Sequence, residues 1–130
     1  MDKPTLFGLD IEESQIKLAR AHAKKAGVAD AILFEVKDMR EFTFKTSYGV
    51  IVTNPPYGER ISDRNQVVKL YRDYGKVFSS LNEWSAFTIT PVSDFERLFG
   101  KKAVKKRKIY NGKLECYYYS VLGAKPPKKI

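Results

Sequence analysis

The chain has 130 residues, of which 43% are hydrophobic, so it can bury the core of one domain or of part of one. No apolar run approaches the roughly 18 residues of a membrane span, and we expect neither a membrane segment nor a signal peptide. The single Cys116 excludes an internal disulfide and fits a reducing cytoplasm. One cysteine and one histidine are too few ligands for a typical metal site, so we expect none.

The net charge of +9 is concentrated at one end of the chain. Residues 1–96 carry 13 basic and 14 acidic side chains and sum to −1, whereas residues 97–130 carry 11 basic and one acidic side chain and sum to +10. A local positive surface of this kind attracts polyanions, nucleic acid first. The alternative is a basic tail that serves only solubility.

The first predicted elements are a strand and a helix. The apolar run "TLFGLD" predicts a strand that ends at Asp10. In the segment that follows, apolar residues recur at helical spacing, and Gly27 suits the position just after a helix end. The expected buried face of this helix comprises Ile16, Ala19, Ala23 and Ala26.

Further strands and helices alternate along the chain. Strands are predicted at 31–36, 48–52 and 84–90, and the last of them is stopped by Pro91. Asp63 is a candidate cap for a long helix, and a short helix runs from Ser93 to a Gly100 terminator. Finally, Asn111-Gly112 separates two strand-like runs and predicts a hairpin with a two-residue type I′ turn.

This alternation predicts an α/β fold, an open parallel sheet with helices on its faces and a C-terminal antiparallel hairpin. Ligands of such sheets bind beyond the carboxyl ends of the strands. Asp10, Asp38 and Asn54 each follow a strand, so we expect them on one rim. Asp10 suits the ribose of a nucleotide-like cofactor and Asp38 its adenine amino group, although each acid has an alternative role in capping or in a turn.

The segment "TNPPYGER", residues 53–60, is the most specific feature of this rim. Prolines end a strand because they lack the N–H that a sheet requires. Asn-Pro-Pro-Tyr after a strand resembles the S-adenosylmethionine-dependent methyltransferases that modify exocyclic amino groups of bases. Together with "FGLDIEESQIKLARAHAKKAGV" and "KRKIYNGKLECYYYSVLGAKPP", it is similar to the guanine-N2 methyltransferases of large-subunit ribosomal RNA, often labelled N6-adenine-specific DNA methylases.

The resemblance implies roles for particular residues. Asn54 Oδ1 and the Pro55 carbonyl would accept from the target amine, Pro56 would keep that backbone rigid, and Tyr57 would stack on a flipped base. The implied cofactor contacts are made by Asp10, Ile11, Asp38, Met39 and Asn54. The implied partner is RNA, in particular 23S ribosomal RNA.

The basic segment supplies candidate RNA contacts. The cations of this segment are Lys101, Lys102, Lys105, Lys106, Arg107 and Lys108. They can bind RNA phosphates, or the segment can be a solvated loop. Tyr117, Tyr118 and Tyr119 suggest a stacking platform, but strand alternation favours packing, with Tyr118 on one face and its neighbours on the other.

The chain departs from this family's pattern at its start. A first strand, a Gly-rich loop and a THUMP RNA-binding domain precede the "GLD" segment in the family, and no G-x-G-x-x-G occurs here. We therefore expect residues 1–123 to be an incomplete Rossmann-like methyltransferase domain and residues 124–130 a basic tail. The family strand order is 3-2-1-4-5-7-6, and its central strand 1 is the one missing here.

This gap has consequences for the isolated chain. We expect weak or no binding of S-adenosylmethionine and no methyl transfer by the chain alone. Strands beside the gap expose unpaired edges, which can pair with each other, with the missing part, or between copies in a strand-swapped oligomer. Two other functions stay open: an adenine-amino DNA methyltransferase and a non-catalytic nucleic-acid-binding module.

Overall fold

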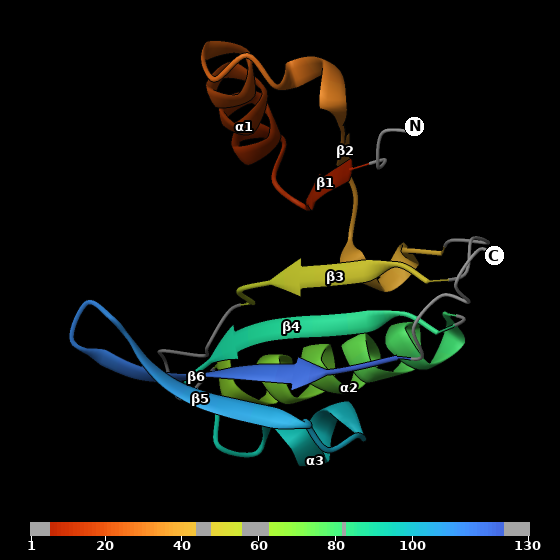
Figure 1. The fold of residues 1–130 in the computed structure, drawn as a ribbon, viewed down its shortest axis with the longest axis vertical. Helices are drawn as coiled ribbons and strands as arrows, with labels where there is room; N and C mark the ends of the chain where they lie inside the picture. Colours follow the sequence, from red (N-terminus) through yellow and green to blue (C-terminus); the bar gives the residue numbers. More distant parts are fainter. Residues whose placement is uncertain (1–5, 44–47, 56–62, 82, 124–130) are drawn as a thin grey trace, which may run out of the picture. The chain divides into compact units, whose positions relative to one another are not determined.

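The computed structural model describes residues 6–43, 48–55, 63–81 and 83–123 (Figure 1). The chain forms two compact units, Met1–Phe42 and Thr43–Ile130. The expected basic tail lies outside the described residues. No helix in the described ranges has the length and apolar character needed to cross a membrane.

The first unit is a parallel strand pair with one long helix. Its elements are β1 (Leu6–Asp10), α1 (Glu13–Lys25), the 3₁₀ turn η1 (Ala29–Ala31), β2 (Ile32–Val36) and the 3₁₀ turn η2 (Met39–Glu41). β1 and β2 run in register from Leu6 beside Ile32 to Asp10 beside Val36.

The helix α1 buries the face that its sequence predicts, except at its end. Ile16 and Ala23 are buried and Ala19 is half-buried, but Ala26 caps the helix and is exposed. Gly27 follows with a φ of 76°, a left-handed conformation that glycine adopts without strain.

The second unit is a four-stranded sheet with helices. Its elements are β3 (Val50–Thr53), α2 (Arg64–Ser80), β4 (Ser85–Thr90), α3 (Phe95–Phe99), β5 (Lys105–Asn111) and β6 (Leu114–Val121). β3 and β4 are parallel, whereas β6 is antiparallel to both β4 and β5. Asp63 occupies the predicted N-cap position of α2, but its side chain makes no capping hydrogen bond. Gly100 ends α3 with a φ of 91°, as predicted.

The strand order confirms the predicted fold class. The two sheets have the orders β1-β2 and β3-β4-β6-β5. These are the orders that 3-2-1-4-5-7-6 leaves when its strand 1 is removed. Among the described strands, β1 pairs only with β2 and β3 pairs only with β4, so each presents a free edge. On β3 this edge carries exposed valines, with Val52 at 75% exposure.

The hairpin turn differs from the prediction by one residue. Asn111 pairs with Leu114, so the two loop residues are Gly112 and Lys113 rather than Asn111 and Gly112. Gly112 has a φ of 66°, and Lys113 is not among the described residues with positive φ. Glycine at the first loop position with a positive φ is the pattern of a type II′ turn. The glycine therefore determines the type of turn, and Asn111 belongs to the last residue pair of the hairpin strands.

Aromatic side chains from both helices form the core of the second unit. Tyr71, Tyr74 and Phe95 are almost fully buried, and α2 lies along one face of the sheet (Figure 1). Phe95 of α3 packs edge-on against Tyr71 of α2 with ring centroids 5.9 Å apart, and it contacts Tyr119 of β6 at 4.7 Å. These contacts tie α3 to both α2 and the sheet.

The tyrosine run of β6 alternates between the two sheet faces, as predicted. Tyr119 is fully buried on the helix-covered face, with Tyr117 beside it at 6.3 Å between ring centroids. Tyr118 lies on the opposite face and stacks on Phe87 at 6.0 Å. Cys116 is buried in the same strand, which fits its predicted packing role.

Candidate cofactor and nucleic-acid sites

Asp10 is the last residue of β1 and shapes the turn into α1. Its Oδ1 accepts a hydrogen bond from the Glu12 backbone N–H at 2.9 Å, and its carbonyl accepts one from the Lys37 N–H at 2.9 Å. The turn thus uses one carboxylate oxygen, which is the capping role considered as the alternative. A carboxylate has a second oxygen, so this geometry also permits a hydrogen bond to a ligand hydroxyl.

Asp38 takes a matching position after β2. Its Oδ1 accepts from the Arg40 backbone N–H at 2.9 Å, and the Arg40 guanidinium lies 3.9 Å away. Met39 begins η2 and is half-buried, whereas Ile11 is 65% exposed. Because β1 and β2 are adjacent and parallel, these residues gather at one end of the strand pair with Asp10.

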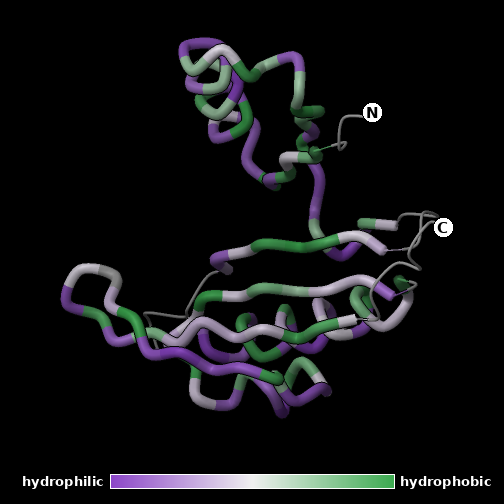
Figure 2. Tube along the Cα trace, viewed as in Figure 1, coloured by the Kyte–Doolittle hydropathy of each residue, from purple (hydrophilic) through white to green (hydrophobic). Residues whose placement is uncertain are grey.

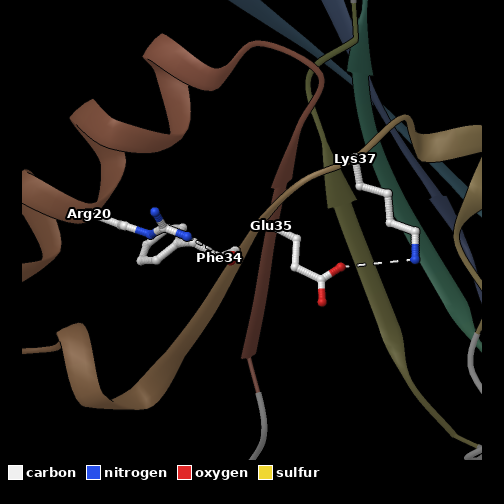
Figure 3. Close-up of polar contacts among 4 residues, drawn as sticks. All are labelled: Arg20, Phe34, Glu35 and Lys37. Atoms are coloured by element: carbon white, nitrogen blue, oxygen red, sulfur yellow. Dashed lines mark hydrogen bonds and ion pairs between the residues drawn. The ribbon is translucent and has the colours of Figure 1, made fainter.

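A contact that the sequence did not reveal holds α1 against β2. The Arg20 guanidinium donates to the Phe34 carbonyl oxygen at 3.1 Å, and Lys37 lies 3.9 Å from the Glu35 carboxylate (Figure 3). The arginine satisfies a backbone acceptor on an edge strand and links the helix to the strand that leads to Asp38. Arg20 lies four residues after the buried Ile16 and so shares its face of α1, which was the available signal for this contact.

Asn54 and Pro55 directly follow β3. Thr53, the last residue of that strand, lies beside Thr88 of β4. Asn54 is exposed and Pro55 is buried, so the polar side chain stands at the surface on a backbone that is fixed by packing. Pro56 and Tyr57, the other predicted catalytic residues, lie outside the described residues.

The predicted rim residues are divided between the two units. Asp10, Ile11, Asp38 and Met39 belong to Met1–Phe42 and lie together, whereas Asn54 belongs to Thr43–Ile130. In each unit, the residues follow the carboxyl ends of parallel strands, as the sequence predicted.

The four cations predicted on β5 fall on opposite faces of the strand. Lys106 and Lys108 share the helix-covered side, where they contact other side chains. The Lys106 ammonium lies 4.4 Å from the Tyr117 ring centroid, and Lys108 forms a 3.2 Å ion pair with Glu115. Hydrogen bonding to Glu115 raises the pKa of Lys108, and the same contact, with a second from Tyr117, lowers the pKa of Glu115.

Lys105 and Arg107 occupy the other face of β5. They lie beside Ser120 and Tyr118 of β6, and both are exposed. Figure 2 shows β5 hydrophilic over most of its length, whereas β3 is mostly hydrophobic. Lys101 and Lys102, before the strand, are also exposed, with the Lys101 ammonium 5.4 Å from the Phe78 ring centroid. The basic residues of β5 are therefore divided between both faces of the sheet.

Comparison with known proteins gives a consistent family match. Residues 1–120 match the family model described as UPF0020, RMKL-like methyltransferase domain. The chain is 37% identical over 129 residues to "Putative RNA methyltransferase YpsC" of Bacillus subtilis strain 168, covering 98% of this chain and 34% of that protein. It is 35% identical over 115 residues to ribosomal RNA large subunit methyltransferase K/L of Legionella pneumophila strain Philadelphia 1, covering 88% of this chain and 16% of that protein.

A solved structure shows the same fold. The structure described as "SMU.472, a putative methyltransferase complexed with SAH" superposes with a TM-score of 0.90 at 36% identity, covering 96% of this chain and 33% of that one. The chain therefore spans about a third of YpsC and of SMU.472, and about a sixth of the K/L enzyme.

Proposed function

The chain belongs to the family of RMKL-like methyltransferase domains, and we therefore propose that it forms part of an S-adenosylmethionine-dependent enzyme that methylates a base of RNA. The observation that carries this proposal is the placement of an Asn-Pro segment at the carboxyl end of β3, in a sheet whose strand order matches the family. The finer proposal is that the target is the N2 amino group of a guanine in 23S ribosomal RNA. The name of the K/L relatives supports the large-subunit ribosomal RNA, whereas the guanine rests on the motif resemblance alone.

The carboxylates at the ends of β1 and β2 are the proposed cofactor contacts. Asp10 would accept from the ribose hydroxyls and Asp38 from the adenine amino group, with Ile11 and Met39 against the adenine. The SAH bound to SMU.472 supports this type of ligand. When bound, S-adenosylmethionine supplies the electrophilic methyl group.

Asn54 and Pro55 are the proposed contacts of the target amine. An exocyclic amine is a poor nucleophile because its lone pair is delocalised into the ring. Asn54 Oδ1 and the Pro55 carbonyl would accept its two N–H groups, which favours a pyramidal nitrogen with its lone pair directed at the methyl carbon. The nitrogen held there would take the methyl group from the sulfonium sulfur that the cofactor supplies, and it would then lose a proton to solvent. The burial of Pro55 fixes this backbone before the substrate arrives.

RNA is favoured over DNA by the basic hairpin and by the relatives. The two alternative functions, a DNA methyltransferase and a non-catalytic nucleic-acid-binding module, are distinguished from RNA methylation by the following experiment. The full-length protein that contains this chain is incubated with S-adenosylmethionine carrying a labelled methyl group and with either a 23S ribosomal RNA transcript or DNA of the same sequence. Mass spectrometry of the nucleosides then identifies the methylated base.

The test compares Asn54→Ala with Asn65→Ala, which removes the same side chain from an exposed position of α2. Loss of an acceptor aligned with the reacting group lowers kcat by about 100-fold or more, so Asn54→Ala should show this loss and Asn65→Ala should not. Label on DNA alone would indicate the DNA enzyme. Unchanged methylation by Asn54→Ala would overturn the proposed chemistry, and RNA binding without any methylation would indicate the binding module.

A further inference from the structure

The β5–β6 hairpin extends past the end of the sheet. The last residue of β4, Thr90, lies beside Tyr117, and three further pairs of the hairpin have no β4 residue beside them. These pairs are Ile109 with Cys116, Tyr110 with Glu115, and Asn111 with Leu114. At about 3.3 Å per residue, the hairpin projects about 10 Å past β4. Figure 1 shows this overhang beyond the arrowheads of β3 and β4.

The overhanging end of the hairpin lies at the same end of the sheet as Asn54. β5 and β4 are both antiparallel to β6 and therefore run in the same direction, as does β3. Thr53, the residue before Asn54, is level with Lys106 across the sheet, because both align with the Thr88–Tyr119 pair. Extending this register by one residue places Asn54 level with Arg107, three residues before Tyr110. With about 10 Å along the strands and about 14 Å across three strand spacings, the two residues are roughly 17 Å apart.

This separation is too large for both residues to contact one base, but it suits nucleotides that flank the target. The surface at the overhanging end has the matching chemistry. The Tyr110 side chain is 66% exposed. Its neighbours Lys108 and Glu115 form an ion pair with each other. Lys113 stands exposed in the turn, and no ion pair of it occurs among the described residues.

We propose that the overhanging end of the β5–β6 hairpin binds single-stranded RNA beside the target nucleotide, with Tyr110 stacking on a base and Lys113 contacting a phosphate. Exposed aromatic side chains stack on unpaired bases of any sequence, and nearby cations fix the backbone. Residues 97–130 sum to +10, which provides the long-range attraction. This inference rests on the proposed function and adds the surface that positions the RNA.

The experiment measures binding of a fluorescein-labelled, unstructured 20-nucleotide RNA of mixed sequence to the full-length protein by anisotropy. Tyr110→Ala should weaken binding by about 5- to 150-fold, the range for loss of one base–aromatic stack, while Tyr110→Phe keeps the ring and stays within about threefold. Lys113→Ala should weaken binding and reduce the slope of log K against log salt by about 1. Lys24→Ala, at an exposed position near the end of α1, removes the same charge elsewhere and serves as the matched control.

The result that overturns the proposal is the same RNA affinity for Tyr110→Ala, Lys113→Ala and the parent protein. Equal losses for Lys113→Ala and Lys24→Ala would also overturn it, because they would show attraction by net charge alone. Thermal unfolding of each variant identifies a folding defect, and the turn variant Lys113→Ala keeps the test valid if Tyr110→Ala is unstable. The proposed function is tested separately: loss of methylation by Asn54→Ala with unchanged RNA binding by Tyr110→Ala would reject only the hairpin surface.

Discussion

The hydroxyl of Tyr74 lies 2.8 Å from Oγ1 of Thr88, and this buried hydrogen bond joins α2 to the middle of the sheet. Tyr71 and Thr90 form an equivalent pair, also at 2.8 Å. By contrast, the buried hydroxyl of Tyr119, on the same face of the sheet, has no hydrogen-bond partner among the described residues. Two tyrosines in one core thus differ in whether their hydroxyl contributes to stability.

This difference predicts opposite effects of one substitution. Tyr74→Phe should lower the free energy of unfolding by about 1–2 kcal/mol, because it leaves Thr88 Oγ1 buried without its partner. Tyr119→Phe should leave it unchanged or raise it by up to about 1 kcal/mol, because it removes a buried hydroxyl that makes no hydrogen bond. Urea denaturation measures the free energy of unfolding of both variants and so checks the two expected effects. Equal losses would contradict the hydrogen-bond assignment.

The same tyrosine predicts a loss of stability at alkaline pH. Burial raises the pKa of Tyr74 to about 12 from 10.0, and the hydrogen bond with Thr88 opposes part of this rise. The unfolded chain therefore ionises first, and stability falls as the pH rises from 10 to 12. The loss from this group is about 3 kcal/mol. Tyr74→Phe should fall less steeply over that range in urea denaturation at fixed temperature, whereas parallel curves would reject a titrating Tyr74.

A tight contact between two helices predicts that alanine is harmful at a helical glycine. A Cβ on Gly75 of α2 would lie 2.1 Å from the carbonyl oxygen of Phe99, so α3 would have to move. Gly75→Ala should lower the free energy of unfolding by about 1–3 kcal/mol, despite the roughly 1 kcal/mol that alanine gains in a helix. Ser79→Ala, exposed on the same helix, should be nearly neutral. A stabilised Gly75→Ala protein would contradict this packing.

The proposed ribose contact predicts a binding defect without a folding defect. In Asp10→Asn, the amide oxygen can still accept from the Glu12 N–H, but the negative charge is lost. S-adenosylmethionine should bind the full-length variant about 10- to 100-fold more weakly in calorimetric titration, the range for a hydrogen bond to a charged group. Asp30→Asn, exposed in η1, is the matched control. Unchanged affinity of Asp10→Asn for S-adenosylmethionine would show that Asp10 does not contact the cofactor.

The strands could be predicted because each signal was local or periodic, whereas their order was predicted only from the family resemblance. Strand alternation placed Tyr118 opposite Tyr117 and Tyr119, and the glycines at 27 and 100 marked helix ends through their positive φ. These features depend on backbone geometry, which a short sequence window already encodes.

Contacts between distant residues could not be predicted in this way. The Arg20 bond to the Phe34 carbonyl and the approach of Gly75 to Phe99 depend on how elements pack. The hairpin turn was assigned one residue too early, because the register of the two strands decides which residues form the loop. The same register divides the cations of β5 between two faces, although they are consecutive in the sequence. That Asp10, Asp38 and Asn54 share one rim stays a prediction, because Asn54 belongs to the other unit.

The unequal packing of the two units has a thermodynamic consequence. Among the described residues of Met1–Phe42, only Ile16 and Ala23 are buried, whereas the second unit has a dense aromatic core. An isolated two-stranded sheet with so little buried surface is marginally stable. A ligand at the proposed contacts Asp10 and Asp38 would therefore stabilise this unit, and part of its binding free energy would be spent on ordering the unit. Under the proposed function, cofactor binding and the folding of this unit would form one coupled equilibrium, with a heat-capacity change larger than the ligand alone would produce.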